Sequence, residues 1–133
     1  MIYQRDIRVE FNHCDPAGIV FYPRYYEMIN SVCENFFRDA VGRSFGEMIA
    51  QVQGVPTVRL ETDFKAPSRL GELLDFQLTI RRLGRTSVTF SIDAFGDGVL
   101  RLSALITLVF VSGSLKACTW PEDMRARMAE YVE

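Results

Sequence analysis

The spacing of hydrophobic residues changes along the chain, and each change predicts a different kind of element. Residues Tyr3–Phe11 alternate imperfectly between apolar and charged positions, which predicts a first strand. Pro23 suits the first turn of a following helix and Gly42 suits its end, which places a long helix over residues 22–41. Its apolar residues recur every three or four positions, as one helical face requires: Tyr22, Tyr26, Ile29, Cys33, Phe36, Phe37 and Ala40.

The remainder of the chain is predicted to form short strands between two smaller helices. The capping-box spacing from Ser44 to Glu47 predicts a brief second helix that ends by Gly54. The pair Asp97-Gly98 predicts a hairpin turn, and a terminal helix is expected from about Pro121. Four runs have apolar residues at every second position, as strands with one buried face do: residues 57–65, 76–81, 88–94 and 100–110.

One long aromatic helix followed by antiparallel strands is an α+β layout. The helix over residues 22–41 is the only element large enough to cover the apolar face of the sheet, so we expect the sheet to curl around it. The chain length of 133 residues fits a single domain spanning 1–133. In the run Thr57–Lys65, we expect Val58, Leu60 and Phe64 to share one face of their strand.

Composition and charge exclude several classes of protein. Hydrophobic residues make up 48% of the chain and charged residues 24%, with a formal net charge of −2. Nucleic-acid binders normally show a basic excess, so no nucleic-acid partner is expected. Three cysteines at unrelated spacings and one histidine argue against a metal site and favour reduced thiols in a cytoplasmic protein. The charged N-terminal stretch resembles no targeting segment, and no apolar run approaches the ~20 residues that span a bilayer.

Asp15 lies in a polar loop directly before the predicted long helix. The N–H groups at a helix N-terminus are unpaired and positively polarised, so they favour a nearby carboxylate and can hold a developing oxyanion. A lone carboxylate can attack an activated acyl group or deprotonate a water. A thioester suits such a site because a thiol of pKa ~8.5 leaves without an acid. The alternative from this pattern alone is that Asp15 only caps a turn.

The stretch FNHCDPAGIVFYPRYYEMIN, residues 11–30, resembles the signature of hot-dog-fold thioesterases of the 4-hydroxybenzoyl-CoA thioesterase type. The shared pattern is an acid, small residues with glycine, two aliphatic residues, an aromatic-rich step and the long central helix. The order of elements along nearly all of the chain agrees with this family. The resemblance therefore implies a hot-dog fold, in which an antiparallel sheet wraps around one central helix, and hydrolysis of an acyl-CoA without a cofactor.

The resemblance also implies roles for two residues of this stretch. The family position of Asp15 is the catalytic carboxylate, acting as nucleophile or general base. The position of Tyr22 gives its backbone N–H to the thioester carbonyl. Hot-dog subunits pair through their sheets into dimers, usually assembled into tetramers with active sites shared between chains. We therefore expect a homodimer assembled into a homotetramer, and the ten Phe and five Tyr fit such an assembly.

Four further residues are implied to bind the substrate: Asn30, Phe45, Arg85 and Ser87. Asn30 lies near the acyl pocket, where hydroxybenzoyl-specific members carry an acid, so a phenolic acyl group is not implied here. Phe45 is placed to close the same pocket, and Arg85 and Ser87 to contact the nucleotide of coenzyme A, whose phosphates need cations. The alternatives are an exposed helix residue at Asn30, a core role for Phe45 and a solvated hairpin around Arg85. Lys65 and Arg69 are weaker candidates for the phosphates.

Two neighbours of Asp15 invite other chemistry. His13 can form a dyad with Asp15, but the resemblance gives this position no constant catalytic role, and we favour a loop-orienting histidine. Cys14 has no partner that would activate its thiol, and Cys33 falls on the apolar helix face. The sequence therefore predicts an acyl-CoA thioesterase. The alternatives are a hot-dog protein that binds acyl-CoA or acyl carrier protein without hydrolysis and, ranked last, a hydratase.

Overall fold

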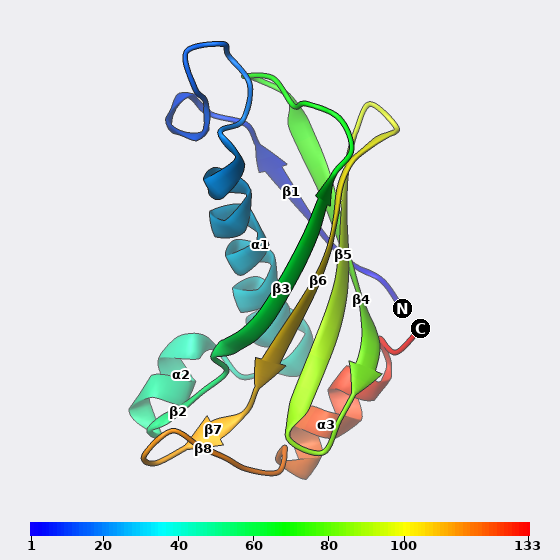
Figure 1. Ribbon diagram of the computed structural model, residues 1–133. Coiled ribbons are helices and arrows are strands. Elements are labelled where there is room, and N and C mark those ends of the chain that lie inside the picture. The colour runs from blue at the N-terminus through cyan, green and yellow to red at the C-terminus, as the bar shows by residue number, and fades with distance from the viewer.

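A long helix lies across the concave face of a curved antiparallel sheet (Figure 1). The computed structural model describes residues 1–133. Helix α1 runs over Tyr22–Phe36 and continues into the π-helical turn η2, Phe37–Val41. Gly42 ends this helix with φ 81°, a left-handed conformation that glycine adopts without a steric penalty. The helix predicted over residues 22–41 and its glycine stop are confirmed, but Tyr22 and Tyr26 of its predicted apolar face are exposed.

Five strands form the main sheet in the order β1-β4-β5-β6-β3, and all neighbouring strands are antiparallel. Their inward side chains alternate with polar outward ones and pack against α1, as in Phe90 of β5. An antiparallel sheet wrapped around one helix confirms the predicted α+β, hot-dog fold. The strands are β1 (Tyr3–Arg8), β3 (Thr57–Phe64), β4 (Leu73–Leu83), β5 (Ser87–Gly96) and β6 (Val99–Val109).

Two sequence predictions about the strands need correction. The first strand ends at Arg8, and Phe11–His13 forms a 3-10 turn, η1, instead of extending the strand. The shared apolar face predicted for β3 is not buried, because Val58 is 61% and Phe64 47% exposed. Strand β3 is the edge of the sheet, and an irregularity after Thr57 shifts its register against β6. One side of β3 therefore has unpaired backbone groups.

Smaller elements close the end of the molecule opposite the Asp15 loop. Helix α2 (Phe45–Ala50) begins at Ser44, whose side chain and that of Glu47 form the predicted capping box. Helix α3 (Glu122–Ala129) confirms the predicted terminal helix and buries two methionines. The small sheet of β2 (Gln53–Gly54), β7 (Val111–Ser112) and β8 (Lys116–Ala117) was not predicted, because its strands are too short to show alternation. None of the helices combines the length and apolar composition needed to cross a membrane.

Candidate active site

The loop that carries Asp15 is a closed turn in front of α1. Cys14 and Val20 pair as an antiparallel bridge, so the two ends of the loop lie side by side. Inside it, the Asp15 N–H donates to the Ile19 carbonyl at 3.0 Å, and the Gly18 N–H donates to the Asp15 carbonyl at 2.9 Å. Gly18 has φ 79°, a conformation that side chains with a Cβ rarely adopt. The loop therefore has a defined shape that depends on its glycine.

The Asp15 carboxylate is half-buried and only partly used by its own loop. Its Oδ1 accepts the Ala17 N–H at 2.9 Å, in the geometry of an Asx-turn. No side chain or backbone group of the chain donates to Oδ2, and no cation pairs with this carboxylate. One oxygen is thus positioned by the loop, while the other is available to a ligand or a water.

The N-terminus of α1 has a free amide next to this loop. The Phe21 N–H donates to the His13 carbonyl at 2.9 Å, and no side chain caps the helix. Pro23 has no N–H, so the Tyr22 N–H is the first unpaired donor of the helix. Because His13 and Phe21 are hydrogen-bonded, Asp15 and Tyr22 stem from the same closed loop. The two residues that the sequence predicts as catalytic therefore belong to one closed loop and the helix turn that follows it.

The histidine and cysteines near the site have local structural partners. His13 Nδ1 accepts the Glu10 N–H at 2.8 Å, which fits a histidine that orients the loop. The Cys14 thiol contacts the Glu10 carbonyl at 3.5 Å. Cys33 lies in the core, where burial raises the pKa of its thiol to about 12. Nothing in this arrangement activates a thiol as a nucleophile.

Three predicted substrate residues lie at the opposite end of the molecule. Phe45 lines an open apolar cleft of about 480 Å³ between α2 and the small sheet, together with Met48, Val55 and Leu115. The hairpin between β4 and β5 carries Arg85 and Ser87 and lies beside α3, far from the Asp15 loop (Figure 1). Helix α1, whose 15 residues span roughly 22 Å, separates the two ends.

The hairpin with Arg85 and Ser87 is held by a buried tryptophan. The Trp120 ring stacks on Phe37 and Phe110, and its Nε1–H donates to the Ser87 carbonyl at 3.1 Å. The Trp120 N–H donates to the Arg85 carbonyl at 3.2 Å. The Arg85 side chain is exposed and forms no ion pair within the chain. This guanidinium is therefore fixed at its base and free at its tip.

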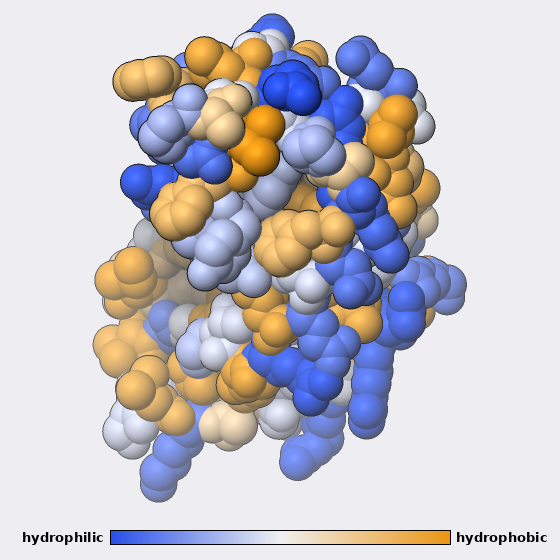
Figure 2. All heavy atoms as spheres, turned by 45° about the horizontal axis from the view of Figure 1, so that its top comes forward, coloured by the Kyte–Doolittle hydropathy of each residue, from blue (hydrophilic) through white to orange (hydrophobic).

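Asn30 and the aromatic residues before it form an exposed stripe on α1. Tyr22, Tyr26 and Asn30 are four residues apart, so they lie on one face of the helix, and all three are exposed. The Tyr22 ring contacts the Phe64 ring edge-on, with centroids 6.2 Å apart. The stripe thus begins beside the free edge of β3. Figure 2, which turns the Asp15 end forward, shows hydrophobic side chains interspersed with polar ones over this surface.

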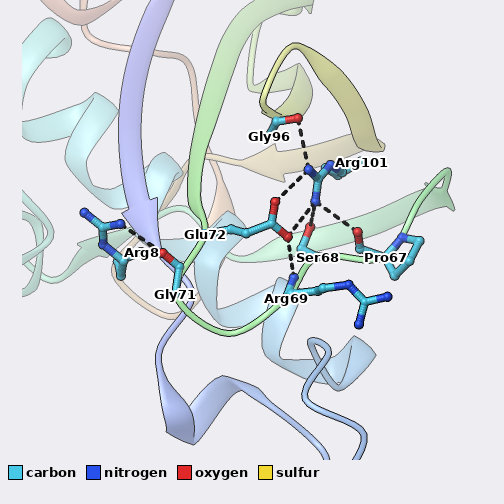
Figure 3. A network of polar contacts seen from close by, with 8 residues as sticks. All are labelled: Arg8, Pro67, Ser68, Arg69, Gly71, Glu72, Gly96 and Arg101. Carbon is cyan, nitrogen blue, oxygen red and sulfur yellow. Dashed lines mark hydrogen bonds and ion pairs between the residues drawn. The ribbon is translucent and has the colours of Figure 1, made fainter.

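One feature next to the site had no counterpart in the sequence pattern. The segment between β3 and β4 supports the Asp15 loop: the Val20 N–H donates to the Ser68 carbonyl at 2.9 Å, and the Leu70 N–H donates to the Gly18 carbonyl at 3.1 Å. Arg101 of β6 holds this segment in turn, with Glu72 as its ion partner (Figure 3). The Arg69 side chain points away from this network, and Lys65 is exposed. Partners 29 residues apart leave no local sign in the sequence.

Known proteins resemble this chain both in sequence and in structure. The family model described as the thioesterase superfamily matches residues 17–101. The 4-hydroxybenzoyl-CoA thioesterase of Pseudomonas sp. (strain CBS-3) is 27% identical over 82 residues, which cover 60% of this chain and 58% of that protein. The match thus spans less than two thirds of this curated relative.

Solved structures match over nearly the whole chain. A gentisyl-coenzyme A thioesterase is 29% identical with a TM-score of 0.86, over 92% of this chain and 99% of the other. A Staphylococcus aureus protein solved in complex with CoA has a TM-score of 0.92 at 15% identity, over 98% of this chain and 84% of the other. At 15% identity, the likeness to the Staphylococcus aureus protein shows only a shared fold. The thioesterase superfamily model, in contrast, matches more than half of the chain by sequence. The chain belongs to the thioesterase superfamily.

Proposed function

We propose that this protein hydrolyses an acyl-CoA thioester to the free acid and coenzyme A. The observation that carries this proposal is that one closed loop leads from Asp15, whose Oδ2 has no hydrogen-bond partner, to the unpaired Tyr22 N–H at the start of α1. Membership of the thioesterase superfamily, and likeness to enzymes that act on aromatic acyl-CoAs, supports the reaction class. A free amide at the positive end of a helix is suited to stabilise the oxyanion of a tetrahedral intermediate.

Two reaction routes use the same two groups. In the first, Asp15 takes a proton from a water molecule while the water oxygen attacks the thioester carbonyl carbon; the C–S bond then breaks and the thiolate takes up a proton. In the second, a carboxylate oxygen of Asp15 attacks the carbonyl, the thiolate leaves, and water hydrolyses the resulting mixed anhydride. In both routes the Tyr22 N–H donates to the carbonyl oxygen as its negative charge develops.

The site requires a second copy of the chain to bring all its candidate residues together. Strand β3 has a free edge with exposed Val58 and Phe64, which is suited to pair with the same edge of a second copy. Antiparallel pairing places the end of β3 in one copy beside Thr57 of the partner subunit. The Asp15 end of one copy then lies beside the cleft and the Arg85 hairpin of the other. Further association of two such dimers gives the homotetramer.

The character of the cleft favours an apolar acyl group. Seven of its 11 lining residues are hydrophobic, and none of them is charged. A hydroxyl-bearing acyl group would find no charged acceptor for its O–H in this cleft. We therefore propose an unsubstituted aromatic or a short to medium aliphatic acyl group. The Arg85 guanidinium is suited to bind a phosphate of coenzyme A.

The proposed activity is tested with a panel of acyl-CoA and acyl carrier protein thioesters, with release of free thiol as the readout. The variant Asp15→Ala is expected to lose activity by about 100-fold or more. Asp6→Ala, which removes an exposed carboxylate on β1, is the matched control and should retain wild-type activity. Binding of acyl-CoA without turnover would indicate a non-hydrolytic protein instead. Single-turnover hydrolysis in heavy-oxygen water separates the routes, because label in Asp15 marks the anhydride.

Mixed assemblies test whether each site is shared between two chains. Asp15→Ala and Arg85→Gln homodimers are each defective at both sites. If Asp15 of one copy works with Arg85 of the partner subunit, an Asp15→Ala/Arg85→Gln heterodimer regains one intact site. Mixing and reassembling the two variants should then give more activity at low substrate than the sum of the separate variants. No gain on mixing, with heterodimers verified by mass, would contradict a shared site.

A further inference from the structure

Arg101 of β6 joins the sheet to the segment that supports the Asp15 loop. Nη1 of Arg101 donates to the Pro67 carbonyl at 2.9 Å, to Ser68 Oγ at 3.2 Å and to Glu72 Oε1 at 3.0 Å. Nη2 donates to Glu72 Oε2 at 2.8 Å and to the Gly96 carbonyl at 3.0 Å (Figure 3). The ion pair is thus bidentate, and the arginine side chain is 8% exposed.

Two local features of the sheet direct this side chain toward the segment. In the pairing of β5 with β6, Ala94 opposes Leu102 and Phe95 opposes Leu100, so Arg101 is the extra residue of a β-bulge. A bulge breaks the alternation of side chains and re-aims one of them. Gly96 provides the space, because a Cβ there would lie 2.7 Å from Cζ of Arg101. The bulge and the glycine together give the guanidinium a prepared position.

The segment held by Arg101 has no regular structure of its own. Residues 65–72 connect β3 to β4 without forming a helix or strand. The Arg101 carbonyl accepts the Lys65 and Ala66 N–H groups at 2.8 and 3.2 Å, and Glu72 Oε1 accepts the Arg69 N–H at 2.6 Å. The backbone of Arg101 therefore holds the start of the segment, and its side chain holds the later turn through Glu72.

The Asp15 loop is built on this segment. Residues Ser68 and Leu70 hydrogen-bond to Val20 and Gly18 of the loop, and Ile19 and Arg69 pair between them as an antiparallel bridge. The carbonyl of Ile19 accepts the Asp15 N–H. A continuous set of hydrogen bonds thus runs from Arg101 through the segment to the backbone of Asp15. Loss of the Arg101 side chain removes the bonds to Pro67, Ser68 and Glu72, next to the residues that bond to the loop.

We propose that Glu72 and Arg101 are positioning residues that hold the Asp15 loop in its working geometry for the hydrolysis proposed above. They do not touch the substrate, and they act through residues 67–70. The inference rests on the proposed function for its effect on catalysis, whereas its effect on the loop is independent of any reaction. A displacement of about 1 Å in a catalytic group can cost on the order of 100-fold in rate.

The kinetic test compares variants of the pair. Arg101→Lys keeps the charge, but one ammonium group cannot reach the five oxygen acceptors that the guanidinium fork spans. Arg101→Lys and Arg101→Met are both expected to lower kcat by about 10- to 100-fold, with KM for the acyl-CoA changed by less than about threefold. Glu72→Gln retains one acceptor for Arg101, so its kcat should lie between the kcat of these two variants and that of the wild type. Loss of affinity with kcat unchanged would overturn the inference.

A double variant separates positioning from stability. Glu72→Met/Arg101→Met removes both charges, and replacing a buried ion pair by apolar residues commonly restores stability that a single removal loses. We expect its resistance to urea to exceed that of Arg101→Met while its kcat stays equally low. Met124→Ala in α3, at the opposite end of the molecule, is a control for loss of stability alone. Its kcat, measured at temperatures below its unfolding transition, should equal that of the wild type. Recovery of kcat together with stability in the double variant would contradict positioning.

Hydrogen exchange measures the loop without reference to activity. In Arg101→Met and Glu72→Gln, the Val20 and Leu70 amides should exchange at least about tenfold faster than in the wild type, while amides of the β4–β5 pair keep their rates. Unchanged exchange at Val20 and Leu70 would overturn the inference even if kcat falls. A wild-type protein with no thioesterase activity would contradict the proposed function, and the exchange rates would still decide whether the pair holds the loop.

Discussion

At the scale of single residues, the candidate site depends more on backbone than on side chains. Asp15 contributes a carboxylate, but its proposed companion is the N–H of Tyr22, and the Tyr22 ring is exposed. The free amide arises because the Phe21 N–H is already paired and Pro23 has none. The side chain at position 22 can therefore change without removing the proposed oxyanion donor.

This arrangement allows the amide itself to be deleted. Tyr22→Pro removes the N–H at the first helical position, where proline is tolerated, and Phe21 already has the extended conformation (φ −72°, ψ 123°) that a following proline requires. We expect kcat to fall by about 100- to 1,000-fold, the cost of losing one oxyanion donor. Tyr22→Ala keeps the amide and should retain most of kcat. Steady-state kinetics on the two variants, with circular dichroism to confirm folding, decides between the amide and the ring.

At the scale of elements, glycines with opposite backbone conformations have opposite effects on stability. Gly42 ends the long helix with φ 81°, and a Cβ there would also meet the Arg127 guanidinium. Gly42→Ala is expected to lower the free energy of unfolding by about 1–2 kcal/mol. Gly46 lies inside α2, where a Cβ would make only an ordinary contact with Ser44 Oγ at 3.8 Å, so Gly46→Ala should raise that free energy by about 0.5 kcal/mol. Urea denaturation measures both, and equal effects of the two variants would contradict this account.

The elements that the sequence predicts correctly are those determined by nearby residues. The periodicity of α1, the capping box at Ser44 and the Asp97-Gly98 turn all depend on residues within a few positions of one another. The position of β3 at the sheet edge depends on which strands lie beside it, so alternation alone wrongly predicted a buried face for Val58 and Phe64. The alternation of apolar residues predicts a strand, but it does not predict which strands lie beside it in the sheet.

The same distinction applies to the candidate site. Asp15 and Tyr22 are predicted together because only six residues connect them. The distance of Arg85 from that loop, and the support from Glu72 and Arg101, depend on the folded arrangement of separate strands. No local pattern encodes either of them. The sequence therefore predicts Asp15 and Tyr22 as the catalytic pair, but it does not predict the ion pair of Glu72 and Arg101 that supports their loop.

At the scale of the whole molecule, the ion pair between Glu72 and Arg101 makes the free energy of unfolding depend on pH. Hydrogen bonds from Arg101, and from the Arg69 N–H, lower the pKa of Glu72 from 4.5 to about 2. A carboxyl whose pKa is lower in the folded state stabilises that state fully above pH 4.5, and this contribution is lost as the pH falls toward 2.

We therefore expect the free energy of unfolding of Glu72→Gln to lie about 2 kcal/mol below that of the wild type at pH 7, and this difference to shrink between pH 4.5 and pH 2. Urea denaturation at a series of pH values measures it. Glu133→Gln breaks the exposed pair with Arg81 and should change stability by less than about 0.5 kcal/mol. A Glu72→Gln difference that stays constant down to pH 3 would argue against the lowered pKa.

The free edge of β3 is expected to determine both assembly and activity. Val58→Asp places a charge on this edge, where pairing with a second copy would bury it. We expect sedimentation velocity to show a shift toward monomers and kcat/KM to fall by about tenfold or more, with an unchanged far-ultraviolet spectrum. Val99→Asp, a half-exposed position at the start of β6, is the matched control and should assemble normally. Monomeric Val58→Asp with full activity would refute the shared site.

The packing of Trp120 gives the protein a built-in spectroscopic probe. It is the only tryptophan in the chain, it is 3% exposed, and its indole N–H binds the Ser87 carbonyl in the hairpin that carries Arg85. Its fluorescence therefore reports on one end of the molecule. An adenine nucleotide that binds at Arg85 should change the emission in a saturable titration, and the change should disappear in Arg85→Gln. An acyl group that reaches only the Asp15 loop of a single chain should leave the emission unchanged. The fluorescence of Trp120 can therefore distinguish binding at the two halves of the proposed site.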